Sequence, residues 1–557
     1  MAPIIAWTVS NSEFQWTRLD VMIIGSISTI AAVLVLALSA VFLCAGKKDE
    51  KKAAEPMPGD EEKQPEEMGV SPSLTPGSDR GVFSKSNKDD SGKDSDSAGR
   101  ISDPIAVASA TPAVKTAYDF AVDLYRVACL PHKEQRGTSS EVTYNTKVVS
   151  PLAIQSVLFP CYLGAGGRTR DEIRQIIYPR LVSAETATGS NSLKSVDEHV
   201  REVASTIDGV SSKSAEVCPF QGLFMALRVY GPANRYQYAS AFYDQLNIRG
   251  CRLCDFVEYR FDPPVGTSRT QLSLSTFANS VNHFAGMTSE GRIRQPISEP
   301  VLKDALGLPQ GRTKAPPQKP PGLLAFSFVR VECNWLKPFN RQSIIKERFK
   351  MGPGPGEDVE VDMMTARSKT FRYFQDEHCR LVRLHLVDEK SRANLYIIMP
   401  TEHGTLANME AWLTGEKLLK LLVHCRQAAD IEVTMPRLLV KTHLTPTRMN
   451  ECLRQMGLKT SFDPQRADFT PMIERKTHQQ LHIASVVHEA VLKACDDPDP
   501  KSATGPTEVL TGEPERIFFC NEPFIFVVAS GRFYQIPVLI GRYGGPTTES
   551  VTGSKLE

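Results

Sequence analysis

The longest hydrophobic run of the chain lies near its N-terminus. From Val21 to Gly46 there is no charged side chain. A helix needs about 20 such residues to cross the core of a bilayer, so the pattern predicts a transmembrane helix over residues 21–46. The alternative is the apolar part of a signal peptide, which is usually about 7–15 residues long and close to the N-terminus. This run is longer and follows residues 1–20, which favours the membrane-spanning interpretation.

Beyond residue 111 the hydrophobic positions follow helical and strand periods in turn. Residues 113–127 repeat apolar side chains every three or four positions, which indicates one face of an amphipathic helix. A second helix is predicted over 151–163, with Pro151 in its first turn. Short apolar runs predict strands at 323–331, 395–399, 431–435, 524–528 and 538–540. Residues 448–456 have a helical pattern. No strand–helix–strand rhythm recurs, so we expect a mixed α+β domain.

Composition divides the chain further. Residues 47–111 are rich in Lys, Glu, Asp, Ser, Pro and Gly and contain one aromatic residue, Phe83. Such a segment buries too little apolar surface to offset the entropy of ordering it, so we interpret it as a disordered linker, although its charge blocks also suit a binding role. The predicted parts are an N-terminal tail at 1–20, a transmembrane helix at 21–46, the linker at 47–111, a folded domain at 112–545 and a flexible C-terminal tail at 546–557.

The charges that flank the hydrophobic run predict its orientation. Lys47, Lys48, Lys51 and Lys52 follow the run, whereas Arg18 is the one basic residue before it. Basic residues favour the cytoplasmic side of a membrane. The pattern therefore predicts a single-pass membrane protein whose folded domain lies in the cytoplasm.

Charge and cysteine content limit the partners and cofactors that the sequence predicts. The formal net charge is +1, and no basic cluster is interleaved with aromatic residues, so nucleic acid is not an expected partner. The chain has 12 cysteines, dispersed along it, and no Asn-x-Ser/Thr acceptor site, which favours a reducing compartment. Cys251 and Cys254 form a CxxC pair, but a zinc site needs four ligands and no second pair is present. We expect neither a metal nor a cofactor.

Between about residue 112 and 545, several blocks of sequence follow one another in a characteristic order. They are VVSPLAIQSVLFPCYLGAGGRTRDEIRQII (148–177), VNHFAGMTSEGRIRQPI (281–297), LLAFSFVRVECNWLKPF (323–339), VDMMTARSKTFRYFQDEHCRLVRLHL (361–386), IEVTMPRLLVKT (431–442), IASVVHEAVLKA (483–494), FFCNEPFIFVV (518–528) and PVLIGRY (537–543). These blocks resemble the serpin family. The resemblance implies a serpin fold with three β-sheets, about nine helices and an exposed reactive-centre loop. The family is mostly extracellular, which makes an extracellular domain the alternative location.

The resemblance also implies a mechanism without enzymatic activity of its own. A serpin offers its loop as bait to a serine or cysteine protease. After cleavage, the N-terminal part of the loop inserts as a new central strand of the largest sheet. Residues inside a sheet must donate ladder hydrogen bonds, and alternate side chains must suit a buried face. The hinge of inhibitory members therefore has two acids, a Gly, a Thr and then small residues.

The hinge of this chain departs from that pattern. Asp496 and Asp497 fit the acidic start, but Pro498 replaces Gly, Asp499 replaces Thr, and Pro500 follows. Proline removes a ladder donor, and burying an unpaired aspartate is costly. We therefore expect insertion to stall and interpret the domain as a non-inhibitory binding or scaffold module. The residues that return to the family pattern are Ser502, Ala503 and Thr504.

A working protease inhibitor is the alternative interpretation. Inhibition is the default of the family, and the loop up to Pro523 has the length typical of inhibitory members. Counting along the loop predicts a scissile bond between Gly512 and Glu513, with Leu510 and Arg516 as other bait positions. Gly512 has no side chain to fill the primary pocket of a protease. The expected partners are thus the membrane and either a serine or cysteine protease or another protein.

Four further residues match family positions beneath the sheet opening. Trp335 matches the Trp at the end of a central strand, His488 the central His and Ser150 a nearby hydroxyl, whereas Ser327 replaces an Asn. The shorter Ser327 predicts an altered contact with His488. A hydrolytic triad of Ser150, His488 and an aspartate is the alternative, but no nucleophile-elbow motif surrounds Ser150. We favour a core histidine whose hydrogen bonds are satisfied.

Overall fold

The largest sheet has six strands in the order β1-β4-β3-β5-β14-β13. They span Trp7–Val9 (β1), Ala215–Arg228 (β3), Asp255–Phe261 (β4), Leu323–Cys333 (β5), Leu438–Leu444 (β13) and Ile483–Ala494 (β14). The central strands β5 and β14 run parallel to one another. The predicted strand at 323–331 is confirmed. Residues 7–9, inside the predicted tail, form an edge strand that pairs with β4.

Not every part of the chain is described by this computed structural model. The described residues are 7–9, 110–130, 145–178, 215–228, 239–242, 244, 255–261, 268–288, 291, 293–305, 322–337, 339, 344–351, 358–386, 393–401, 404–473, 481–495, 510–531 and 534–546. None of the helices in these ranges is both long and apolar enough to span a membrane. The predicted transmembrane helix at 21–46 and nearly all of the predicted linker and C-terminal tail lie outside the described residues.

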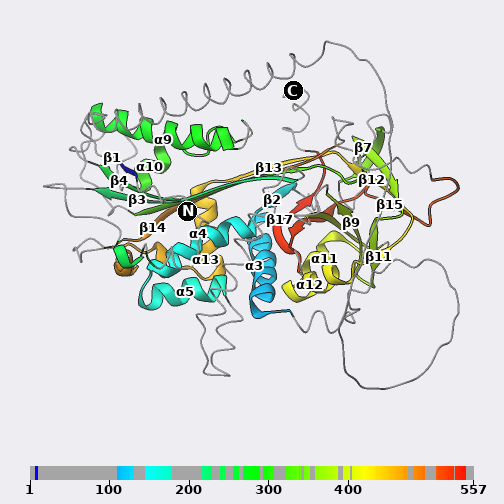
Figure 1. Ribbon diagram of the computed structural model, residues 1–557, viewed down its shortest axis with the longest axis horizontal. Helices are drawn as coiled ribbons and strands as arrows, with labels where there is room; N and C mark the ends of the chain where they lie inside the picture. The colour runs from blue at the N-terminus through cyan, green and yellow to red at the C-terminus, as the bar shows by residue number, and fades with distance from the viewer. Residues whose placement is uncertain are drawn as a thin grey trace, which may run out of the picture. The chain divides into compact units, whose positions relative to one another are not determined.

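Each face of the six-stranded sheet is covered by different helices. Figure 1 shows α9 (Ser268–Thr288) and α10 (Glu299–Ala305) on one face and α4 (Pro151–Gly164) and α13 (Pro446–Met456) on the other. Side chains of a strand alternate between the two faces. Phe326 and Phe328 of β5 therefore pack in the cluster of α9, whereas Ala325 of β5 belongs to the main core. Ser327, between the two phenylalanines, faces the main core.

The helices of the main core begin at positions capped by a side chain, except for α5, which follows Gly166. They are α3 (Pro112–Cys129), α4 (Pro151–Gly164), α5 (Gly167–Ile177), α11 (Leu406–Trp412), α12 (Gly415–His424) and α13 (Pro446–Met456). The hydroxyl oxygens of Thr111, Ser150 and Thr445 each accept a backbone N–H three residues further on, and a proline follows each of them. These caps satisfy N–H groups that have no partner inside the helix. The three predicted helices are confirmed.

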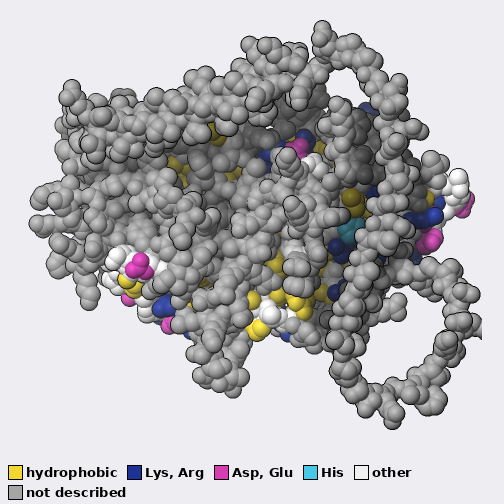
Figure 2. Space-filling view, viewed as in Figure 1, with side chains coloured by type: hydrophobic (Ala, Val, Ile, Leu, Met, Phe, Trp, Pro, Cys, Tyr) yellow, Lys and Arg dark blue, Asp and Glu magenta, His cyan; other side chains and the backbone are white. Residues whose placement is uncertain are grey.

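Two further sheets complete the predicted three-sheet α+β fold, which is confirmed. The seven-stranded sheet has the order β11-β8-β9-β10-β16-β17-β2 and the four-stranded sheet the order β15-β12-β7-β6. Their bounds are β2 Lys147–Val149, β6 Ile345–Lys350, β7 Asp358–Ser368, β8 Arg372–Gln375, β9 Cys379–His385, β10 Asn394–Pro400, β11 Gln427–Ala428, β12 Ile431–Pro436, β15 Arg516–Phe519, β16 Phe524–Ser530 and β17 Ile536–Tyr543. Figure 2 shows Lys and Arg side chains gathered at the end of the molecule where β9, β12 and β15 lie.

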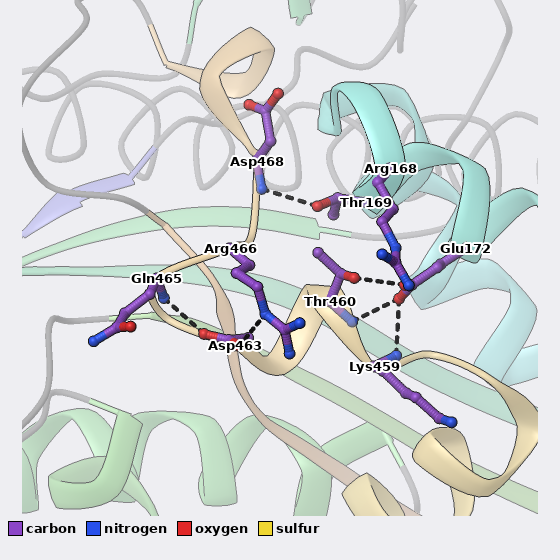
Figure 3. A network of polar contacts seen from close by, with 9 residues as sticks. All are labelled: Arg168, Thr169, Glu172, Lys459, Thr460, Asp463, Gln465, Arg466 and Asp468. Atoms are coloured by element: carbon purple, nitrogen blue, oxygen red, sulfur yellow. Dashed lines mark hydrogen bonds and ion pairs between the residues drawn. The ribbon is translucent and has the colours of Figure 1, made fainter.

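Glu172, on α5, ties this helix to the segment that follows α13 (Figure 3). Its carboxylate accepts hydrogen bonds from the N–H of Lys459 at 2.9 Å, the N–H of Thr460 at 2.6 Å and the hydroxyl of Thr460 at 2.5 Å. Burial alone would raise the pKa of Glu172, but these hydrogen bonds outweigh it, and the pKa is lowered.

Removing the Glu172 carboxylate leaves two backbone donors without their acceptor. We expect Glu172→Ala to lower the free energy of unfolding by about 2 kcal/mol. The control is Arg168→Ala, which removes a mostly exposed ion-pair partner of Glu172 and should cost about 0.5 kcal/mol or less. The stabilisation by Glu172 is complete above its ordinary pKa of 4.5 and is lost as the pH falls through the lowered folded-state pKa. Urea unfolding at neutral and strongly acidic pH tests this, and an equal loss at both would contradict it.

Candidate functional site

The candidate site is the line where β5 and β14 meet, together with the loop that leaves β14. The strands pair in register, with His488 opposite Ser327 in the middle and Lys493 opposite Glu332 near the end. Nearly every residue of both strands is buried. A strand that enters here must therefore separate two strands that are paired in register from Ser485 opposite Leu324 to Lys493 opposite Glu332. The predicted hinge residues, 496–504, lie outside the described residues.

His488 connects the middle of this strand pair to the start of α4. The N–H of Ser150 donates to its Nε2 at 3.0 Å, so Nε2 carries no proton. The other ring nitrogen, Nδ1, carries the proton and lies 3.2 Å from both the carbonyl oxygen and the hydroxyl oxygen of Ser327. Burial lowers the pKa of His488 to about 4, which keeps the imidazole neutral at physiological pH.

The structure brings together three of the residues that the sequence singles out. Ser327 is shorter than the Asn of the family, yet it contacts His488 through its hydroxyl and its backbone carbonyl. The hydroxyl of Ser150 donates to the carbonyl oxygen of Val538 at 2.8 Å and accepts the N–H of Ala153. Because its proton points to a carbonyl and not to the imidazole, the geometry does not support a hydrolytic triad.

Trp335 holds the point where the loop leaves the sheet. Its side chain is buried, and its indole N–H donates to the carbonyl oxygen of Cys495 at 2.6 Å. Nearby, the ammonium of Lys493 on β14 pairs with Glu332 on β5 at 2.5 Å. The guanidinium of Arg330 also binds Glu332. The last described residues before the hinge are thus fixed to β5 and to the segment that follows it.

The far end of the loop is held by an ion pair on the four-stranded sheet. Arg367, on β7, donates through Nε and Nη2 to the two carboxylate oxygens of Asp430, at 2.9 Å each. Its Nη1 donates to the carbonyl oxygen of Gly512 at 2.7 Å. The guanidinium holds the pKa of Asp430 below its usual range. We call this arrangement of Arg367, Asp430 and Gly512 the loop clamp.

The loop clamp determines how the predicted scissile bond is presented. Gly512 and Glu513 are exposed, but Gly512 has a φ of +82°, a left-handed conformation that favours glycine. A peptide that binds along the strand edge of a partner is extended and has negative φ. The bond is therefore accessible without being extended. The sequence alone does not single out Arg367, on β7, and Asp430, just before β12, because they are far apart in the chain and form no motif.

The CxxC pair, Cys251 and Cys254, lies outside the described residues. The remaining predicted site residues fall into two groups. Ser150, Ser327, Trp335 and His488 line the β5–β14 pair, whereas Gly512 and Glu513 lie at the four-stranded sheet. The loop that joins the groups leaves β14 and returns to β15, which pairs with β12.

A largest sheet whose central strands meet in parallel, with a loop that leaves one of them for a separate sheet, defines a serpin-type fold. A sequence model of the family Serpin (serine protease inhibitor) matches residues 314–546. That match includes β5, β14, the loop and the last three strands. Together with the relatives and solved structures below, it supports the serpin family for this chain.

Two relatives and two solved structures illustrate the similarity. Serpin H1 of Pongo abelii is 23% identical over 436 residues, which cover 77% of this chain and 90% of that protein. Serpin I2 of Homo sapiens is 20% identical over 444 residues, which cover 79% and 93%. The thermophilic serpin tengpin in its native state has a TM-score of 0.58 at 15% identity and covers 78% of this chain and 94% of its own. Uncleaved ovalbumin has a TM-score of 0.56 at 16% identity and covers 78% and 100%.

Breaking the loop clamp should expose the predicted scissile bond to proteolysis. Arg367→Gln removes the charge-assisted hydrogen bond to Gly512, so we expect a broad-specificity protease to cut between Gly512 and Glu513 about tenfold faster. The control is Lys346→Gln on β6 of the same sheet, which removes an exposed ion pair with Glu360 and should leave the rate unchanged. Mass spectrometry of a digestion time course gives the rates. Equal rates for wild type and Arg367→Gln would contradict the role of the clamp.

Proposed function

We propose that this protein is a membrane-tethered, serpin-fold binding or scaffold protein that does not trap proteases. One observation carries the proposal: a hinge of Pro498, Asp499 and Pro500 follows shortly after β14, which is paired with β5 along most of its length. Trapping requires that this hinge be the first part of the loop to enter between the two strands.

The prolines oppose that entry through the backbone. A strand between β5 and β14 has a neighbour on each side, so its N–H groups must donate to a ladder. Pro498 and Pro500 have no N–H, and proline is found at edges and bulges of sheets and not in their interior. Separating β5 from β14 also breaks the existing ladder, which the first inserted residues cannot replace.

Asp499 opposes entry through its charge. Lys493 and Arg330, two cations at this end of the strand pair, both bind Glu332 already. The carboxylate of Asp499, if it inserted here, would lie near Glu332, which already binds both of these cations. Burying an aspartate without a partner costs several kcal/mol, which adds to the loss of ladder hydrogen bonds. Insertion therefore stalls at its first residues.

A protease inhibitor is the second candidate function. Plasminogen activator inhibitor 2 of Homo sapiens, an inhibitor by name, is 23% identical over 235 residues, which cover 40% of this chain and 53% of that protein. The exposed Gly512 and Glu513 also offer a site for cleavage. The two candidates differ in the fate of the loop after cleavage, because only an inhibitor inserts the cleaved loop into its largest sheet.

A thermal melt before and after nicking of the loop separates the two functions. We expect the nicked wild type to melt at the temperature of the intact protein. Replacing the hinge by Pro498→Gly, Asp499→Thr and Pro500→Ala restores donors and removes the charge. The nicked triple variant should therefore melt about 10 °C or more above its intact form and form a covalent complex with the nicking serine protease.

Ser502→Ala is the matched control, because it changes a loop residue that already fits the family pattern; it should behave as wild type. A rise in the melting temperature of nicked wild type would overturn the non-inhibitory function in favour of the inhibitor. A triple variant that neither gains stability nor forms a complex would show that the hinge is not the cause.

The membrane tether rests on the uncharged run at 21–46 and on the lysines that follow it. A single crossing there places residues 7–9 and the folded domain on opposite sides of the bilayer. The pairing of β1 with β4 requires them on the same side. Tethering therefore requires the release of β1, a three-residue edge strand that pairs with β4 alone among the described strands.

Alkaline carbonate extraction of membranes from cells that express the full chain tests the tether. The chain should stay in the membrane pellet, and a variant without residues 21–46 should move to the supernatant. Protease added outside intact cells should leave the domain uncut, because the flanking lysines favour a cytoplasmic domain. Release of the full chain by carbonate would contradict the tether, and digestion from outside would place the domain in the extracellular space.

A further inference from the structure

Two arginines lie directly opposite each other on the seven-stranded sheet. Arg372 on β8 pairs in register with Arg383 on β9, and Arg383 is opposite Tyr396 on β10. Side chains at directly opposite positions share one face of the sheet, and like charges there are destabilising. We call Arg372 and Arg383 the arginine pair. A third arginine adjoins it, because Arg372 Nη1 donates to the carbonyl oxygen of Arg426 at 2.7 Å.

Two described carboxylates on neighbouring segments are engaged elsewhere. Asp430 is bound by Arg367, and Glu522 pairs with Arg380 at 3.5 Å. Among the described residues, no carboxylate forms an ion pair with either member of the arginine pair. The sheet therefore carries a local positive charge at a position where a structural role alone favours an uncharged residue.

Two buried polar atoms beside the arginine pair make no hydrogen bond within the described part of the chain. They are Arg383 Nε and the hydroxyl oxygen of Tyr396. Tyr396 is 0% exposed, and the guanidinium of Arg383 lies over its ring, 5.8 Å from the centroid. Buried polar atoms in native proteins nearly always have partners. Two such atoms, next to a positive charge that no described carboxylate offsets, are the donors that a bound anion needs.

The charges of the arginine pair also lower the pKa of His385. It lies two residues after Arg383, on the same face of β9. Burial lowers the pKa of His385 to about 4, and the charges of Arg383 and Arg372 lower it too. The imidazole is therefore neutral at physiological pH and adds no charge of its own to the cluster.

We propose that Arg372, Arg383 and Tyr396 form a binding site for a small oxyanion of the phosphate or sulfate class. Each guanidinium is a planar fork of donors whose spacing matches the oxygens of such an anion, and the tyrosine hydroxyl adds a neutral donor. A dianion between the two arginines removes their repulsion and satisfies both buried atoms. The site is separate from the β5–β14 line, so it holds whether or not the loop inserts.

Inorganic phosphate is the probe that tests the site. The full-length protein is melted in increasing sodium phosphate, with sodium chloride of matched ionic strength as the reference. A ligand that binds the folded state raises the melting temperature in a saturable way. Arg372→Gln and Arg383→Gln should each weaken the apparent phosphate affinity about tenfold or more. Arg380→Gln removes the same charge from β9, but from a residue paired with Glu522, and should leave the affinity unchanged.

The arginine pair leads to a second prediction, which concerns the melting temperature in the absence of phosphate. Because the pair repels itself, Arg372→Gln should raise the melting temperature in chloride while it weakens the response to phosphate. An arginine with a purely structural role would lower the melting temperature and leave the response unchanged. Tyr396→Phe, which removes the hydroxyl alone, should weaken the response to a smaller extent.

The proposal is overturned if wild type shows no saturable rise with phosphate beyond the chloride reference. It is also overturned if Arg372→Gln responds to phosphate as wild type does. Arg372 is only partly buried, so this variant keeps the test valid should Arg383→Gln fail to fold. Neither outcome bears on the thermal melt of the nicked loop, which reports on the proposed function separately.

Discussion

The parallel ladder between β5 and β14 is the constraint on which the rest of this structure depends. It lies at the centre of the largest sheet and separates the α9 cluster from the main core. His488 fastens its middle to α4 through the N–H of Ser150, and Trp335 fastens its end through the carbonyl of Cys495. A neutral imidazole suits this place, because both of its nitrogens are satisfied without a buried charge. The ladder is thus tied to the core at two points along its length.

The loop is held at both of its ends, and by different chemistry. After β14, the buried indole of Trp335 donates a hydrogen bond to the carbonyl oxygen of Cys495. Before β15, Arg367 donates a charge-assisted hydrogen bond to Gly512, which has a left-handed conformation. The two anchors fix the described residues on either side of the loop.

Local sequence patterns, such as helix caps and apolar runs, are sufficient to predict many of the helices and strands. Ser150-Pro151 marks the start of α4, and the apolar run at 323–331 marks β5, because caps and burial act within a few residues. The meeting of Ser150, Ser327 and His488 was expected from family resemblance and not from spacing. Sequence alone does not predict the loop clamp or the arginine pair, because strand register decides which side chains face each other, and no motif marks that register. The pairing of Trp7–Val9 with β4 joins distant segments and was missed for the same reason.

The position of Gly512 has a consequence for how this molecule would look after a single cut. All strands C-terminal to that bond, β15, β16 and β17, are built into sheets, and β16 lies between β10 and β17 with every residue buried. A chain severed there becomes two polypeptides that share one core, as subunits of an obligate heterodimer do. Size-exclusion chromatography under native conditions would report one particle of unchanged mass, and only denaturation would separate the pieces.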